Sequence, residues 1–154
     1  LEDIPGTMFR LGVKGVEGCA PLHNGYFCPD ESSLEIGINV ITTTFAPFQT
    51  MRCCEQIKVN LGYMNQKICM VGLASGLVLG NLGYTHCCIE DVGILRSIPN
   101  LTIVSPADSL EVVKVLQSVL KEKKTSVYIR LTGGANNPIV YNSDYKFVLK
   151  IQTI

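Results

Sequence analysis

The stretch of residues 80–108, GNLGYTHCCIEDVGILRSIPNLTIVSPAD, constrains the fold of this chain more than any other segment. It contains, in order, a glycine-rich turn ending in a histidine, a short helix with acidic residues at its start, a Pro-Asn turn, a β-branched strand and the start of another helix. A loop that carries polar groups at the edge of an α/β sheet is the usual place for a ligand site in such folds. The segment therefore predicts an α/β domain with a site on this loop.

The rest of the chain continues the alternation of strands and helices. Short apolar or β-branched runs predict strands at residues 40–45, 67–73, 101–105 and 126–131. Apolar residues at three- and four-residue steps predict helices over residues 47–61, 89–98 and 106–123. The last of these would be capped by Asp108 or Ser109, with four apolar residues facing inward: Leu110, Val113, Leu116 and Leu120. This order predicts a mainly parallel sheet covered by helices on both faces, a three-layer α/β sandwich.

The two ends of the chain carry weaker patterns. Residues 1–39 show no clean period of either kind, so we expect an irregular segment with a strand at 10–13, and a domain truncated on its N-terminal side. Residues 142–154 are predicted to form a tail that adds one trailing strand from position 145. The first residues are acidic and lack an apolar h-region, so we expect no signal peptide and a cytoplasmic location.

Composition narrows the class of partner. The 13 basic and 13 acidic residues cancel, so bulk charge favours neither nucleic acid nor a membrane surface. The longest apolar run, residues 68–79, falls well short of the roughly 20 residues needed to span a bilayer. Charged residues make up 17% of the chain, below the roughly 25% that is typical, which fits a well-buried α/β domain that also has one face covered by a partner.

The seven cysteines argue against a metal centre. Two adjacent pairs occur, at 53–54 and 87–88, and no C-x-x-C motif is present. Vicinal cysteines do not readily chelate one zinc ion together, so the pattern predicts no metal site, including at the His86-Cys87-Cys88 triplet. Small buried thiols in a reducing compartment are the expected state.

Four ordered motifs resemble the pyrimidine-binding domain of transketolases, over about residues 40–141. They are TFAPF at 44–48, RCCEQIK at 52–58, GYTHCCIED at 83–91 and SVYIRL at 126–131, and their wording is similar to the split type, in which two chains make one enzyme. The resemblance implies a thiamine diphosphate-binding fold of the pyrimidine type. It also implies the cofactor thiamine diphosphate and a two-carbon ketol transfer between sugar phosphates.

The resemblance assigns candidate roles to four residues. Phe45 and Phe48 match the aromatic wall against the aminopyrimidine ring, although a Phe at a strand end is often simply core. His86 matches the histidine that faces the hydroxyl groups of the donor sugar, the alternative being a histidine bonded to a backbone carbonyl. Arg130 matches an arginine that binds the substrate phosphate, the alternative being an ion pair with Glu90 or Asp91.

The acidic residues fit the family less well. The family's activating glutamate hydrogen-bonds the aminopyrimidine ring, and Glu35 is its best candidate here, with Glu31 behind it. Glu35 lies only ten residues before Phe45, about half the family's interval, so the pattern departs from the family there. Glu90 and Asp91 are predicted to be structural, stabilised by the dipole and free amides of a helix start.

Two parts that the family needs are missing from this sequence. No G-D-G…N motif for the diphosphate and its metal is present, and only a dozen residues follow position 142, where a third domain would begin. We therefore expect an isolated pyrimidine domain in an oligomer, inactive alone, whose partner chain holds the diphosphate and Mg²⁺. Two alternatives stay open: a catalytically inactive binding or regulatory module, and a related synthase that condenses pyruvate with a sugar phosphate.

Overall fold

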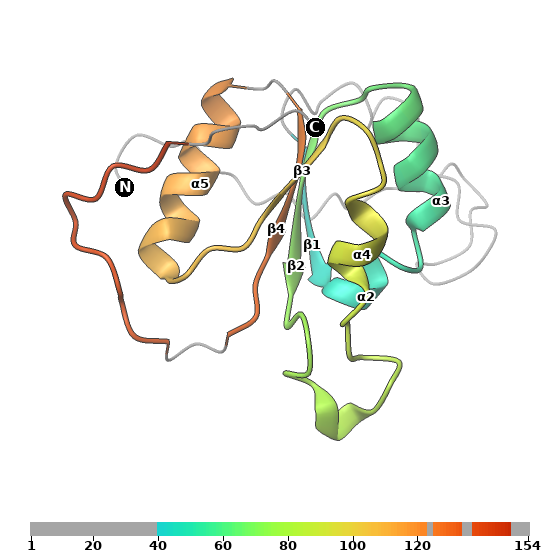
Figure 1. The fold of residues 1–154 in the computed structure, drawn as a ribbon, viewed down its shortest axis with the longest axis horizontal. Helices are drawn as coiled ribbons and strands as arrows, with labels where there is room; N and C mark the ends of the chain where they lie inside the picture. The colour runs from blue at the N-terminus through green and yellow to red at the C-terminus, as the bar shows by residue number, and fades with distance from the viewer. Residues whose placement is uncertain (1–39, 123–124, 134–136, 149–154) are drawn as a thin grey trace, which may run out of the picture. The chain divides into compact units, whose positions relative to one another are not determined.

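The computed structural model describes residues 40–122, 125–133 and 137–148, and the structural statements below concern these residues. Four strands form one sheet in the order β1-β2-β4-β3 (Figure 1). They are β1 (Val40–Phe45), β2 (Ile68–Leu73), β3 (Leu101–Val104) and β4 (Ser126–Arg130). Every pairing within this sheet is parallel, as predicted.

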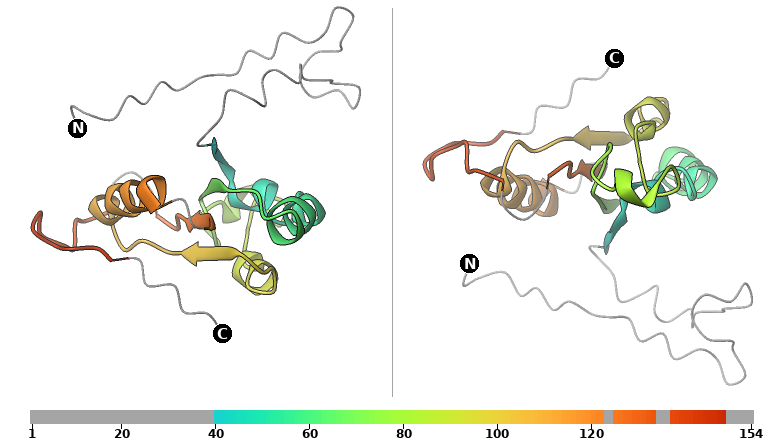
Figure 2. Two further views of the ribbon diagram at one scale, coloured as in Figure 1. Left: turned by 90° about the horizontal axis from the view of Figure 1, so that it is seen from above. Right: turned by 90° about the horizontal axis from the view of Figure 1, so that it is seen from below.

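Helices cover both faces of the sheet. Helix α5 (Ser109–Glu122) lies on one face, and α2 (Ala46–Gln49), α3 (Cys54–Gln56), η1 (Ile57–Tyr63) and α4 (Asp91–Leu95) lie on the other (Figures 1 and 2). The strand order explains this division. The connections from β1 to β2 and from β2 to β3 advance across the sheet, whereas the connection through α5 returns to β4. A right-handed crossover that runs backwards must pass over the opposite face, and the result is the predicted three-layer sandwich.

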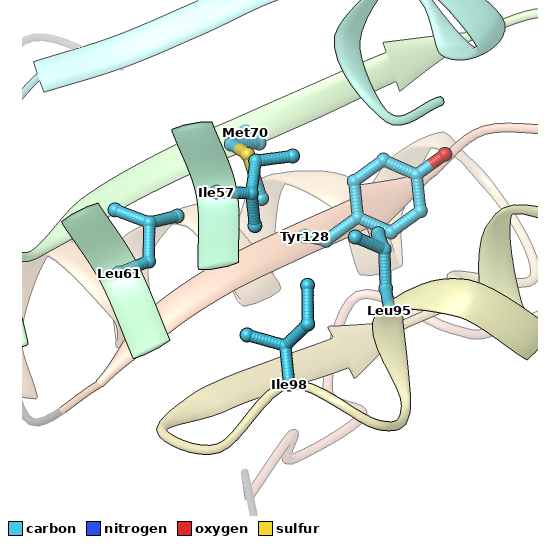
Figure 3. Packing of buried hydrophobic residues seen from close by; sticks show 6 residues of the cluster. All are labelled: Ile57, Leu61, Met70, Leu95, Ile98 and Tyr128. Atoms are coloured by element: carbon cyan, nitrogen blue, oxygen red, sulfur yellow. The ribbon is translucent and has the colours of Figure 1, made fainter. Parts of the chain in front are cut away.

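Two apolar clusters, one on each face, share the central strands. Figure 3 shows the first, which packs η1 and α4 against the sheet through Ile57, Leu61, Met70, Leu95, Ile98 and Tyr128. The second packs α5 against the sheet through Cys69, Val115, Val119, Val127 and Ile129. Neighbouring residues of β4 alternate between the clusters because side chains of a strand point to opposite faces. This is why β4 is buried on both sides.

The prediction of one continuous helix over residues 47–61 is wrong. The helix breaks after α2, and its last part, η1, is a π-helix that runs on to Tyr63, with the Met64 N–H donating to Val59 O at 2.9 Å. At the break, the Thr50 hydroxyl donates to Ala46 O at 2.7 Å. A side chain that bonds the carbonyl four residues back bends a helix, and the apolar spacing gives no sign of this.

Other boundaries also shift. The helix predicted over 89–98 is shorter, and the helix predicted over 106–123 begins only at Ser109, where the Asp108 carboxylate accepts the Glu111 N–H at 2.7 Å as the predicted cap. The inward face of α5 is displaced from the prediction, because Val115 and Val119 are buried while Val113 is 37% exposed.

The predictions for the chain ends are only partly covered. Residues 145–148 form no strand, and the rest of the predicted trailing strand lies outside the described residues, as do the strand expected at 10–13 and all of residues 1–39. None of the helices in the described ranges is long and apolar enough to cross a membrane.

The cysteines divide into buried and accessible thiols. Cys69 and Cys88 are buried and Cys53 is exposed, so the expectation of uniformly buried thiols is wrong for the exposed one. Burial raises the pKa of Cys69 to about 11, which keeps this thiol protonated and unreactive near neutral pH.

Candidate functional site

The candidate site lies at the carboxyl ends of β1, β2 and β4, which meet at one edge of the sheet. Phe45 ends β1 opposite Leu73 of β2, and Gly72 of β2 lies opposite Arg130, the last residue of β4. The long loop from residue 74 to residue 90 extends from this same edge (Figure 1). In parallel α/β sheets, ligands bind outside the carboxyl ends of the strands.

Three rings from separate elements come together at this edge. The ring centroids of Phe45 and Phe48 are 5.8 Å apart, and the His86 ring lies 5.3 Å from Phe48 and 6.3 Å from Phe45, all in edge-to-face arrangements. Pro47 favours the start of α2 directly after β1, and this places Phe48 beside Phe45. Phe45 is 36% exposed and Phe48 is half-buried, and both lie outside the two apolar clusters. This aromatic cluster, Phe45–Phe48–His86, can receive a flat ring.

Two residues that sequence reasoning missed hold the aromatic cluster together. The Arg52 guanidinium lies 4.0 Å from the centroid of the Phe48 ring, and its Nη2 donates to Thr85 O at 3.2 Å. Thr85 also places its hydroxyl 3.0 Å from His86 Nδ1. A cation four residues after an aromatic residue in a helical segment is a weak signal for such a contact. Nothing in the sequence indicated that the Thr85 hydroxyl would contact the His86 ring.

The His86 ring is therefore oriented by a side chain. The alternative of a ring bonded to a backbone carbonyl is not what the structure shows, since Thr85 Oγ1 is the partner of Nδ1. The His86 backbone N–H donates to Gly83 O at 3.0 Å, and the positive φ of Gly83, 84°, suits a glycine at this bend. Among the described residues, His86 Nε2 has no hydrogen-bond partner, so this nitrogen is the one left free.

Arg130 forms an ion pair, and its partner is Asp91 and not Glu90, the two acids between which the sequence did not decide. Its Nε donates to Asp91 Oδ2 at 2.8 Å. Glu90 instead accepts the Tyr84 hydroxyl at 3.1 Å and the Ile89 N–H at 3.0 Å. The prediction that Asp91 serves the free amides of a helix start is wrong, because its carboxylate turns toward the sheet. Asp91 lies on the buried side of α4, where β4 offers it two donors, the Arg130 Nε–H and the Tyr128 hydroxyl.

A network of buried polar side chains joins the loop to the sheet and to α2 beneath the candidate site. The Tyr128 hydroxyl donates to Asp91 Oδ2 at 2.9 Å and lies 3.4 Å from the Ser75 hydroxyl. Burial is the main cause of a strongly raised pKa of Tyr128, so this phenol stays protonated and acts as a donor. The Thr50 hydroxyl lies 3.5 Å from Cys88 Sγ, and burial also raises the pKa of that thiol. The loop is thus joined to α2 and to β4 at its base.

The same loop is closed at its base by backbone hydrogen bonds. Gly76 and Cys88 exchange two N–H···O bonds, of 2.7 and 2.8 Å, and the Ser75 N–H donates to Leu131 O at 2.8 Å. Between these anchors the loop exposes large apolar side chains, among them Leu77 and Tyr84. A fixed base with an apolar tip is a suitable platform for another protein surface.

The arrangement fits the ring end of thiamine diphosphate. The partly exposed aromatic cluster offers the ring faces of two phenylalanines and an imidazole. In the described ranges there is no group of three His, Cys, Asp or Glu side chains suited to a metal ion. The candidate activating acids Glu35 and Glu31 lie outside the described residues.

Comparison with known proteins identifies the family of this chain. A family model described as "Transketolase, pyrimidine binding domain" matches residues 33–137. The chain is 31% identical over 151 residues to an apulose-4-phosphate transketolase subunit of Actinobacillus succinogenes, covering 96% of this chain and 44% of that protein. It is 37% identical over 105 residues to the protein of the same name from Phocaeicola vulgatus, covering 68% of this chain and 33% of that protein.

A solved structure of a transketolase has a similar fold. The chain titled "Split gene transketolase, inactive beta4 tetramer" superposes with a TM-score of 0.59 at 27% identity, over 70% of this chain and 33% of that one. The present chain spans less than half the length of these relatives.

Proposed function

Because this chain belongs to the transketolase pyrimidine-binding domain family, we propose that it is the pyrimidine-side component of a thiamine diphosphate-dependent transketolase. The component would act in two-carbon ketol transfer between sugar phosphates, and its domain would comprise residues 40–141. The observation that carries the proposal is the Phe45–Phe48–His86 aromatic cluster at the carboxyl edge of the sheet.

The residues of the aromatic cluster and Arg130 would each have a separate role. Phe45 and Phe48 would stack against the aminopyrimidine ring and exclude water from it, a contact worth roughly 0.5–1.5 kcal/mol beyond area burial. His86 would hold or move a proton between its Nε2 and a hydroxyl of the donor sugar, with Thr85 orienting the ring. Arg130 would bind the phosphate of the substrate. Thiamine diphosphate, when bound, supplies the nucleophilic carbon and the electron sink of the reaction.

A partner chain would complete the site. The partner would bring the diphosphate-binding site and Mg²⁺, and the assembly would be a cytoplasmic oligomer. Two observations support this: the curated relatives are named as subunits of a transketolase, and the solved relative is titled an inactive tetramer. The exposed apolar loop that extends from the site edge offers a surface for such a partner.

The competing function is a transketolase-like binding or regulatory module without catalysis. It is favoured by the spacing of Glu35, which departs from the family pattern. The substitution Glu35→Gln separates the two functions in the reconstituted complex. A catalytic component loses most of its ketol transfer when the activating carboxylate is removed, whereas a module has none to lose.

Calorimetry tests the proposed function directly. Thiamine diphosphate and Mg²⁺ are titrated into this chain alone and into its mixture with a candidate diphosphate-domain chain, followed by a ketol-transfer assay on the mixture. We expect cofactor binding and transfer only in the mixture. A stable complex that binds no cofactor would overturn the proposal and favour the module.

A further inference from the structure

We propose that Asp91 is a positioning residue that presents the Arg130 guanidinium to the phosphate group of the substrate. The inference rests on the proposed function, since it assigns how that site selects phosphorylated sugars. The Asp91–Arg130 ion pair thus has a role in substrate recognition in addition to joining α4 to β4.

The burial of the two partners is unequal. The Asp91 side chain is completely buried and the Arg130 side chain is 19% exposed. A buried carboxylate cannot reach a substrate in solution, so Asp91 acts only through its neighbours. A buried charge without its partner is strongly unfavourable, and this ties the guanidinium to one place.

The way the pair is bonded leaves the binding end of Arg130 unused. Of the five N–H donors of a guanidinium, only the Nε–H has an acceptor among the described residues, namely Asp91 Oδ2 at 2.8 Å. The two terminal amino groups lie beyond that bond, and they form the planar fork that binds phosphate through two parallel hydrogen bonds. Holding an arginine by its Nε alone orients the fork without occupying it.

The surroundings of the pair restrict its movement. Tyr128 donates to the same Oδ2 atom at 2.9 Å, so two donors lock one oxygen of the carboxylate. The Tyr128 ring has no room to move toward β2, because a Cβ added at Gly72 would lie 2.5 Å from Tyr128 Oη. On the other side, Gly76 has no side chain to cover the fork, and a Cβ there would lie 3.7 Å from Arg130 Nη2.

The test compares a phosphorylated and a non-phosphorylated ketose donor in the complex of this chain with its partner subunit. Asp91→Asn keeps the size of the side chain and removes its charge. We expect this variant to raise KM for the sugar phosphate on the order of 10- to 100-fold, as misplacement of a positioning group does. The kcat/KM for the non-phosphorylated donor should stay unchanged. Glu90→Gln, an adjacent acid that does not contact Arg130, is the matched control and should change neither value.

A double substitution shows whether Asp91 acts through Arg130. In the Arg130→Lys background, Asp91→Asn should cause no further loss of preference for the phosphorylated donor, because the fork it positions is already gone. Equal losses on both donors, no loss on either, or a full additional loss in the double variant would each overturn the proposal. Thermal unfolding of each variant separates these results from a global loss of the fold.

A second readout keeps the inference testable if the wild-type complex proves inactive. That result would overturn the proposed function, and the inference is then decided by NMR of the arginine side chains in the complex. We expect a slowly exchanging Nε–H signal of Arg130 that moves on titration with inorganic phosphate, and a titration weakened at least tenfold in Asp91→Asn. A wild-type Arg130 that does not respond to phosphate would overturn the inference.

Discussion

Phe48 lies between two side chains that set its orientation. The Arg52 guanidinium is 4.0 Å from its ring centroid and the His86 ring is 5.3 Å away. We expect Phe48→Ala to weaken thiamine diphosphate binding about 2- to 13-fold, since the lost stacking is worth roughly 0.5–1.5 kcal/mol. Calorimetry on the reconstituted complex measures this. Tyr63→Ala, an 87% exposed aromatic on η1, is the control, and an equal effect of both variants would remove Phe48 from the site.

Asp108 anchors the start of α5 and the segment after β4 at the same time. One carboxylate oxygen accepts the Glu111 N–H, and the other accepts the N–H groups of Val140 and Tyr141 at 2.7 and 2.9 Å. These bonds, the one from Glu111 first, lower the pKa of Asp108 below its ordinary value of 3.8. A carboxyl whose pKa is lowered by folding stabilises the protein above its unfolded pKa, and this stability is lost as the pH falls through the folded pKa.

This sign predicts an acid-dependent difference. Asp108→Asn should lower the midpoint of thermal unfolding by several degrees at pH 7, and the gap to the wild type should close as the pH falls below about 4. Thermal unfolding followed by circular dichroism from pH 7 to pH 3 measures it. Asp144→Asn, at an exposed position, should show no such gap. A gap that stays constant with pH would show that the charge of Asp108 is unimportant.

Residue spacing predicted some of these contacts and not others. The Asp108 cap follows from local sequence, because a cap is a contact between residues a few positions apart. The partner of Arg130 does not, because Glu90 and Asp91 are adjacent and only the rotation of α4 on the sheet decides which of them faces β4. The role of Thr85 beside His86 likewise depends on the path of the loop.

Strands marked by short apolar runs were predicted well, whereas a helix interrupted by a side-chain hydrogen bond to the backbone was predicted poorly. All four strands lie within a residue or two of their predicted ranges, because short β-branched and apolar runs are reliable signals for buried strands. The break after α2 was missed, since it depends on a hydroxyl that bonds a backbone carbonyl. The shifted inward face of α5 reflects contacts of Val115 and Val119 with the central strands, which periodicity alone does not resolve.

Two glycines in different elements make a matched test of the packing. A Cβ at Gly72 in β2 would lie 2.5–2.9 Å from the end of the Tyr128 ring, whereas a Cβ at Gly93 in α4 would meet nothing within 4 Å. We expect Gly72→Ala to cost about 1–3 kcal/mol of unfolding free energy, as overpacking does. Gly93→Ala should stabilise by about 0.5–1 kcal/mol, because alanine favours a helix. Urea denaturation measures both, and a neutral Gly72→Ala would show that Tyr128 is free to move.

At the scale of the whole molecule, the strand order brings the site together. The Phe45–Phe48 pair, His86 and Arg130 come from three distant parts of the sequence. They follow or end β1, β2 and β4, whose carboxyl ends lie at one edge of the sheet because the strands are parallel. Alternating elements were enough to predict a parallel sheet, a class of sheet in which ligands bind outside the carboxyl ends of the strands. They did not specify the order β1-β2-β4-β3, because the choice of neighbour for each strand depends on contacts between distant residues.

The loop between β2 and α4 leads to the last prediction, which concerns assembly. Its apolar side chains are unusually accessible: Leu77 is 70% exposed and Ile89 is 62% exposed. Exposed apolar side chains gathered on one loop are a common feature of surfaces that bind other proteins. We expect the double substitution Leu77→Asp and Ile89→Asp to weaken association with a diphosphate-domain partner at least about tenfold, since truncation of central interface residues typically costs about 2 kcal/mol or more.

Ile139→Asp, at a 67% exposed position on the segment after β4, is the control. Sedimentation velocity of the mixtures measures association, and circular dichroism checks the fold. If the control weakens the complex and the loop variant does not, the partner binds the segment after β4 and not the loop, and the loop is no part of the shared cofactor site.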